Sequence, residues 1–79
     1  MNARSWLLAA EAIFPRPAGT KAKHNITLGE DGSLELSLIY RNLWEGVTFP
    51  PGDEALSREP LDVLAEVCEQ IQARAGAGA

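Results

Sequence analysis

The stretch from His24 to Arg41 reads HNITLGEDGSLELSLIYR, and it decides the fold. Its second half alternates between apolar and polar residues, with Ile39 as the one apolar exception on the polar face. Alternation with a period of two is typical of a strand that buries one face. The same period places His24, Ile26 and Leu28 on one face of a preceding strand. We therefore expect two antiparallel strands, joined through the GEDG sequence between them.

The length of the connecting turn follows from the register of these two strands. A two-residue turn, DG, would place Leu28 opposite Glu35 and mix apolar with polar side chains. A three-residue turn over 30–32 places Leu28 opposite Leu34 and keeps one face apolar. Gly32 then occupies the left-handed position of a type I turn with a G1 bulge.

A third strand is predicted over 43–49, after a bend at Asn42. Val47 and Phe49 would share a face there, although Gly46 weakens the strand pattern. The PPGD sequence that follows ends the strand. The sheet is therefore expected to be a β-hairpin or a three-stranded meander.

A helix is predicted on each side of this sheet in the sequence. Ser5 can cap the first helix, which runs to about Phe14 and ends at the PRP sequence. Pro60 favours the start of the second helix. The first apolar stripe comprises Trp6, Ala10 and Ile13, with Leu7 and Phe14 beside it, and the second comprises Leu61, Leu64, Val67, Cys68, Ile71 and Ala75. Residues 1–75 are thus predicted to form a single α+β domain with both helices packed on one face of the sheet, and residues 76–79 a disordered tail.

Composition and charge restrict the classes of function. The chain has 79 residues, a net charge of −4 and no apolar run near the length of a membrane-spanning helix. Its first 24 residues carry a net charge of +3, and the remainder carries −7. An acidic chain of this kind lacks the clustered cations that bind phosphate backbones, so no nucleic-acid partner is expected. The N-terminal apolar run is too short for a signal peptide, and the single cysteine indicates a reducing, cytoplasmic compartment.

The residue types that carry catalysis and metal binding are scarce. One histidine and one cysteine cannot complete a structural zinc site, and no calcium-loop spacing is present. His24 and Cys68 both fall on faces expected to be packed, so neither is expected to act as a base or a nucleophile. The sequence predicts no catalytic residue, no metal site, no cofactor and no enzymatic activity.

Two features suit the binding of a partner protein. The first is an acidic face of the second helix, formed by Glu59, Asp62, Glu66 and Glu69. This face is either a solvated surface or a stripe that meets a basic patch. The second feature is a group of residue types enriched at interfaces, Tyr40, Arg41 and Trp44, with Phe49 nearby. Some of these side chains must be core in so small a protein, and Trp44 is the best candidate for exposure.

These observations predict a non-enzymatic protein-binding module. The simplest form is a small acidic regulator or inhibitor of the phage or mobile-element type, which blocks a surface, basic in character, on a larger host protein. The alternative is a structural subunit or assembly factor that acts as a homo-oligomer, such as a homodimer, or within a larger complex. The oligomeric state distinguishes the two.

Overall fold

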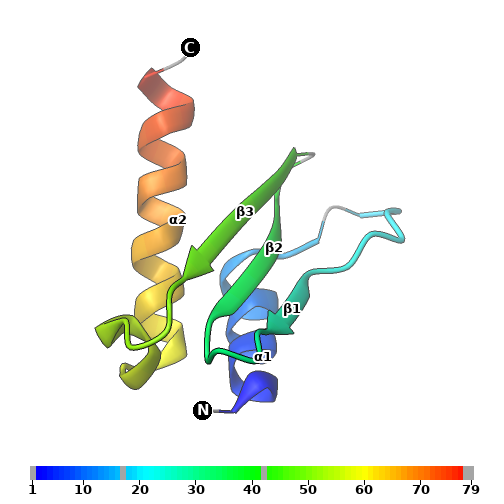
Figure 1. The fold of residues 1–79 in the computed structure, drawn as a ribbon. Helices are drawn as coiled ribbons and strands as arrows, with labels where there is room; N and C mark the ends of the chain where they lie inside the picture. Colours follow the sequence, from blue (N-terminus) through cyan, green and yellow to red (C-terminus); the bar gives the residue numbers. More distant parts are fainter. Residues whose placement is uncertain (1, 17, 42, 78–79) are drawn as a thin grey trace.

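Two α-helices and a three-stranded antiparallel sheet make up the fold (Figure 1). The computed structural model describes residues 2–16, 18–41 and 43–77. The elements are α1 (Ala3–Ile13), β1 (Asn25–Leu28), β2 (Leu34–Tyr40), β3 (Leu43–Phe49), the 3₁₀ helix η1 (Glu54–Ser57) and α2 (Pro60–Ala77). The strand order is β1-β2-β3, so β2 is central. The predicted α+β class is confirmed, and the sheet is the meander rather than an isolated hairpin.

The first hairpin has the register that the alternating pattern predicts. Leu28 pairs with Leu34 across β1 and β2. The Gly32 N–H donates to the Gly29 carbonyl at 3.1 Å, and the Gly29 N–H donates to the Ser33 carbonyl at 2.9 Å. Gly32 has a φ of 92°, a left-handed conformation that glycine adopts without steric cost. The three-residue turn with a bulge is therefore confirmed.

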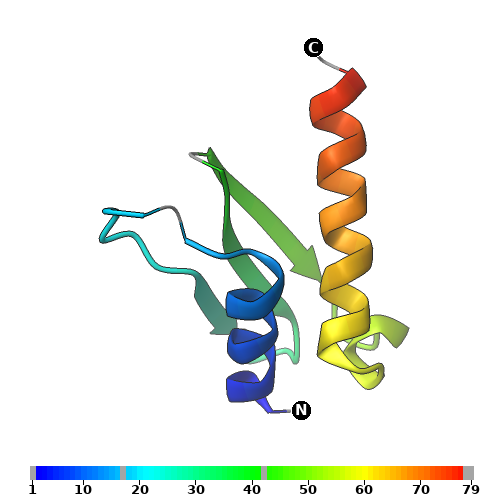
Figure 2. The same cartoon turned by 180° about the vertical axis from the view of Figure 1, so that it is seen from behind.

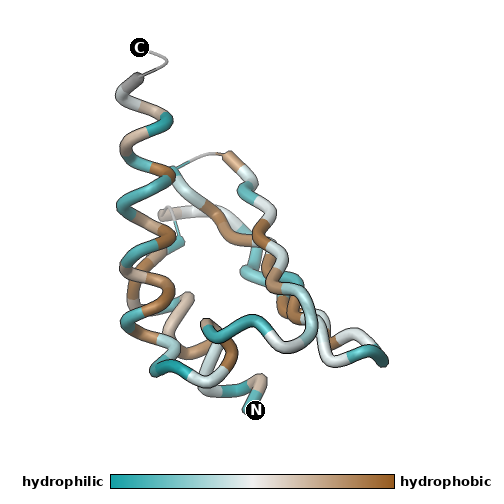
Figure 3. Tube along the Cα trace, turned by 60° about the vertical axis from the view of Figure 1, so that its left-hand side comes forward, coloured by the Kyte–Doolittle hydropathy of each residue, from teal (hydrophilic) through white to brown (hydrophobic). Residues whose placement is uncertain are grey.

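Both helices cover the same face of the sheet (Figures 1 and 2). The alternating leucines of β2 lie fully buried between the helices, and apolar and hydrophilic segments alternate along α2 (Figure 3). The Trp6 ring of α1 packs against Phe49 of β3 with centroids 5.9 Å apart. The buried cluster comprises Trp6, Ala9, Ala10, Phe14, Leu34, Leu36, Leu38, Val63, Leu64, Val67 and Ile71. One face of the sheet is therefore core, and the helices leave the other uncovered.

The first helix begins earlier than predicted. Its cap is Asn2, whose side-chain oxygen accepts from the Arg4 N–H at 3.0 Å, and Ser5 lies exposed inside the first turn. Asparagine caps helices as well as serine does, so local pattern alone did not separate the two. Phe14 forms the other cap, as expected for a helix ending before the proline-rich segment.

The apolar stripe of α2 is rotated relative to the prediction. Val63 is buried, whereas Leu61 is 45% exposed and Ala75 is exposed. Val63 belongs to the buried cluster formed with α1 and β2, and Leu61 in the same turn lies outside it. The helix also includes Gly76 and Ala77, which were expected in the tail, and residues 78–79 lie outside the described part of the chain.

The edges of the sheet differ from the pattern in a similar way. Leu28 shares a face with the core leucines but is 49% exposed, because β1 is an edge strand that α1 covers only in part.

The expected strand over 43–49 is present as β3. The expected break after it is a turn, in which the Asp53 N–H donates to the Pro50 carbonyl and Gly52 has a φ of 81°. The bend expected at Asn42 lies outside the described residues.

Candidate functional site

All four acidic residues of α2 and its entry turn are exposed on the side of the helix opposite the core. They are Glu59, Asp62, Glu66 and Glu69. One of them is already paired: both terminal nitrogens of Arg58 donate hydrogen bonds to the two carboxylate oxygens of Glu66, each at 2.8 Å. These hydrogen bonds lower the pKa of Glu66 below the ordinary value of a glutamate, and the carboxylate raises the pKa of Arg58. The acidic face that remains available to a partner is therefore carried by three carboxylates.

The predicted group Tyr40, Arg41 and Trp44 is divided by the sheet. Trp44 pairs with Ile39 across β2 and β3, which places the two on the uncovered face. Tyr40, the next residue of β2, points to the opposite face and packs against the core. Arg41 lies in the β2–β3 turn with a φ of 59°, and its guanidinium lies 5.3 Å from the centre of the Tyr40 ring. These side chains do not form one patch.

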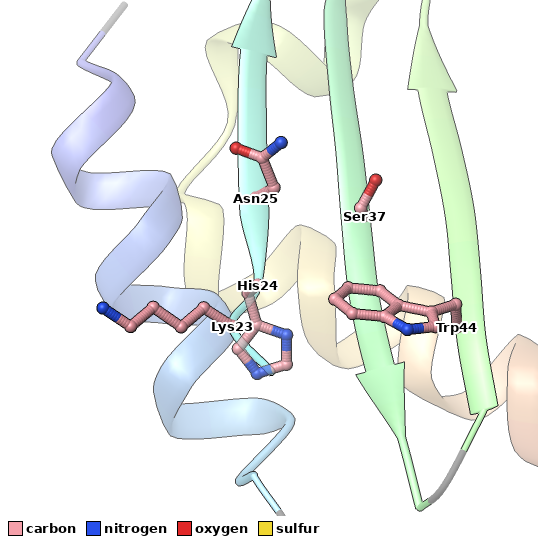
Figure 4. Close-up of a pocket in the computed structure, with 5 residues that line it drawn as sticks. All are labelled: Lys23, His24, Asn25, Ser37 and Trp44. Atoms are coloured by element: carbon pink, nitrogen blue, oxygen red, sulfur yellow. The ribbon is translucent and has the colours of Figure 1, made fainter. Parts of the chain in front are cut away.

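Trp44 is the exposed aromatic of the uncovered face. Its side chain is 57% exposed, although it belongs to a regular strand. The indole lies across the sheet toward β2, while Asn25 of β1 and Ser37 of β2 stand on the same face (Figure 4). Together with Lys23 and His24 they line an open depression of about 610 Å³. This depression combines a large apolar surface with hydrogen-bonding groups and one cation.

Asn25, Ser37 and Lys23 were not among the predicted site residues. The signal was nevertheless available, because the predicted hairpin register already places Asn25 opposite Ser37 on the polar face. Leu43 was also missed as a surface residue. It is 63% exposed beside Trp44, and only the position of the helices shows that they do not cover it. Leu43 is opposite Tyr40, so Leu43 and Trp44 are exposed on different faces at the start of β3.

His24 has a structural role in the fold. It is buried, with 5% exposure, as its place in the strand pattern predicted. Its Nδ1 accepts a hydrogen bond from the Ile39 N–H at 3.0 Å, and its Nε2 hydrogen-bonds the Phe14 carbonyl. The acceptor role of Nδ1 places the ring proton on Nε2. Both ring nitrogens are therefore engaged in joining the end of α1 to β2, and neither is free for acid–base chemistry.

The remaining candidate chemistries can be assessed over residues 2–16, 18–41 and 43–77. In these ranges no three His, Cys, Asp or Glu side chains gather in a way that could hold a metal ion. No helix there is long and apolar enough to cross a membrane. Comparison with protein-family models, curated proteins and solved structures gives no match.

Proposed function

We propose that the chain is a non-enzymatic protein-binding module, a small acidic regulator or inhibitor that occupies a surface of a larger protein. The observation that carries this proposal is the exposure of Trp44 on the sheet face that both helices leave uncovered. Tryptophan is among the residues that contribute most to binding energy when an interface buries them. Asn25 and Ser37 beside it supply the polar groups that accompany such an anchor in typical interfaces.

The acidic side of α2 supports the same proposal through the rate of association. Asp62 and Glu69 are exposed and have no ion-pair partner within 4.0 Å among the described residues. Charges at the rim of an interface act mainly on diffusional encounter with an oppositely charged surface. We therefore assign Trp44 the role of an anchor and this face the role of steering toward a basic partner.

The test compares two exposed apolar residues on different elements. Trp44 is 57% exposed on the sheet, and Leu8 is 59% exposed on α1, on the side of the helix turned away from the core. Tagged wild type, Trp44→Ala and Leu8→Ala would each be used to capture partners from the native host. We expect Trp44→Ala to weaken binding of the captured protein by about thirtyfold, the effect of a hot-spot residue, and Leu8→Ala to bind as wild type.

Charge reversal at Asp62 and Glu69 to lysine tests the second part of the proposal. This double variant should slow association with the captured protein and reduce its dependence on salt, with little change in dissociation. Glu66 is left unchanged because its reversal would also break the contact with Arg58. A captured protein that binds Trp44→Ala as tightly as wild type would exclude the sheet face as the docking surface.

A homo-oligomeric subunit is the second candidate, and the strand order favours it. Among the described residues β1 and β3 each pair on one side only, so their outer edges are open to further strands. Leu43 and Trp44 lie on one of these edge strands. Light scattering of the purified protein separates the candidates: a stable oligomer whose Trp44 fluorescence is shielded from quenchers supports the subunit, and a monomer supports the regulator.

A further inference from the structure

A second cleft lies where the end of α1, the end of β2 and the middle of α2 meet. Its volume is about 530 Å³, within the range of small-molecule sites. Ile13, Phe14 and Tyr40 contribute apolar surface, and Cys68 of α2 lines one side. An adjoining groove of about 350 Å³ shares Tyr40, Arg41 and Gln72 with it and continues along α2 to Gly76. The first hollow is mainly apolar, and the second is apolar and polar in similar measure.

The charged groups of this cleft are all cationic. Arg16 follows α1, Arg41 occupies the β2–β3 turn, and no carboxylate is among the lining residues. In the described part of the chain no acid lies within 4.0 Å of Arg41, and the nearest to Arg16 is Glu11 at 4.0 Å. By contrast, the Arg58 pair is 2.8 Å long. Two guanidinium groups thus face one cleft without a strong anionic partner, a setting suited to a carboxylate.

The surrounding backbone indicates what kind of anion fits. Peptides commonly bind by adding a strand to a free sheet edge, which supplies main-chain hydrogen bonds. The strand at this cleft is β2, which is central and already paired with β1 and β3. An occupant therefore finds two arginines and apolar surface in the cleft, with no strand edge to satisfy a peptide backbone.

We propose that this cleft binds a small amphipathic anion, a carboxylate carrying an unbranched apolar chain. The carboxylate is held by Arg16 and Arg41, and the chain lies on Ile13 and Tyr40. This assignment does not rest on the proposed function, because it uses a different surface and different residues.

Cys68 provides a built-in reporter for the test. It is the one cysteine of the chain, it is half-buried, and it lines the cleft. Decanoate should slow alkylation of the folded protein by iodoacetamide in a saturable manner, as followed by mass spectrometry. Decanol has the same chain without the charge, so it should protect Cys68 only at concentrations about tenfold higher or more.

Variants identify the groups that hold the anion. Arg16→Gln with Arg41→Gln should weaken protection by decanoate about tenfold, the loss expected when charge-assisted hydrogen bonds are removed. Arg4→Gln is the matched control, because Arg4 is an exposed arginine at the opposite end of α1, and it should leave protection unchanged. Circular dichroism checks the fold of each variant. If the double variant is unfolded, Arg41→Gln alone replaces it, and protection by decanoate should then weaken by a smaller factor.

Three results would overturn the proposal. They are protection that does not saturate below the micellar concentration of decanoate, equal protection by decanol, and unchanged protection in the folded arginine variants. A short peptide with a C-terminal carboxylate that protects more strongly than decanoate would also overturn it, in favour of a peptide site. Trp44→Ala is expected to leave this assay unaffected, so the anion site and the protein-binding function can be refuted independently of each other.

Discussion

Replacing His24 with alanine should destabilise the fold more than any change at the surface. The imidazole joins two buried backbone groups, the Phe14 carbonyl and the Ile39 N–H, and all three residues are at most 5% exposed. Each buried polar group left without a partner costs about 1–3 kcal/mol, so His24→Ala should cost about 2–6 kcal/mol. A domain of this length has a free energy of unfolding of about 4–12 kcal/mol. The variant is therefore expected to lose a large part of its stability.

Two amide substitutions separate the contributions of the two ring nitrogens. The amide of His24→Asn reaches the position of Nδ1 and can accept from Ile39, whereas that of His24→Gln reaches the position of Nε2 and can donate to Phe14. Each should lose about 1–3 kcal/mol, because one backbone group regains a partner. Asn25→Ala, the exposed neighbour on β1, is the control and should stay within about 0.5 kcal/mol of wild type.

The measurement is urea-induced unfolding at neutral pH, followed by far-UV circular dichroism. The free energy of unfolding in water is obtained from each curve by linear extrapolation. A His24→Ala protein within about 1 kcal/mol of wild type would refute the reasoning, because the cost of two unsatisfied buried groups exceeds that value. Equal stability of the alanine and both amide variants would also refute the assignment of separate roles to the two nitrogens.

Two further predictions concern the ion pair of α2 and the hairpin turn. Hydrogen bonds from Arg58 lower the pKa of Glu66, so the pair stabilises the fold above the ordinary glutamate pKa and loses this effect as the pH falls through the lowered value. Glu66→Gln should have a lower melting temperature than wild type at neutral pH, and this difference should disappear in strongly acidic buffer. Glu69→Gln is the control, because it breaks no ion pair. A difference in melting temperature that does not depend on pH would contradict the prediction. Gly32→Ala should lower the free energy of unfolding in urea by about 1–2 kcal/mol, because the φ of Gly32 is 92°. Gly46→Ala is the control and should be nearly neutral, because an added Cβ there meets open space. Similar losses in both variants would argue against strain at the turn.

Local periodicity was a sufficient guide to the sheet. The alternation of β2 predicted a strand with one buried face, and the requirement that Leu28 meet Leu34 settled the length of the turn. Both inferences use neighbours in sequence and the alternation of strand side chains between two faces. A shift of the pairing register by one residue would turn every apolar side chain to the solvent face. The burial of His24 followed from the same pattern.

Helix rotation and surface grouping were harder to predict because they depend on distant contacts. Leu61 and Val63 are both apolar residues in the first turn of α2, and only the direction from which α1 and β2 approach decides which one is buried. Tyr40 and Trp44 are close in sequence, yet the turn between β2 and β3 places them on opposite faces. The candidate binding surface therefore contains Trp44 of the predicted group, together with residues from β1 and β2.

The sequence by itself determined the strand pairing, the turn at Gly32 and the acidic side of α2, since each depends on residue spacing along a single element or hairpin. Tertiary structure alone decided which face the helices cover, how Glu66 is partnered and that Arg16 and Arg41 line the same cleft. The physical reason is that side-chain exposure and the meeting of charges depend on the packing of elements distant in the chain, which a local period does not encode.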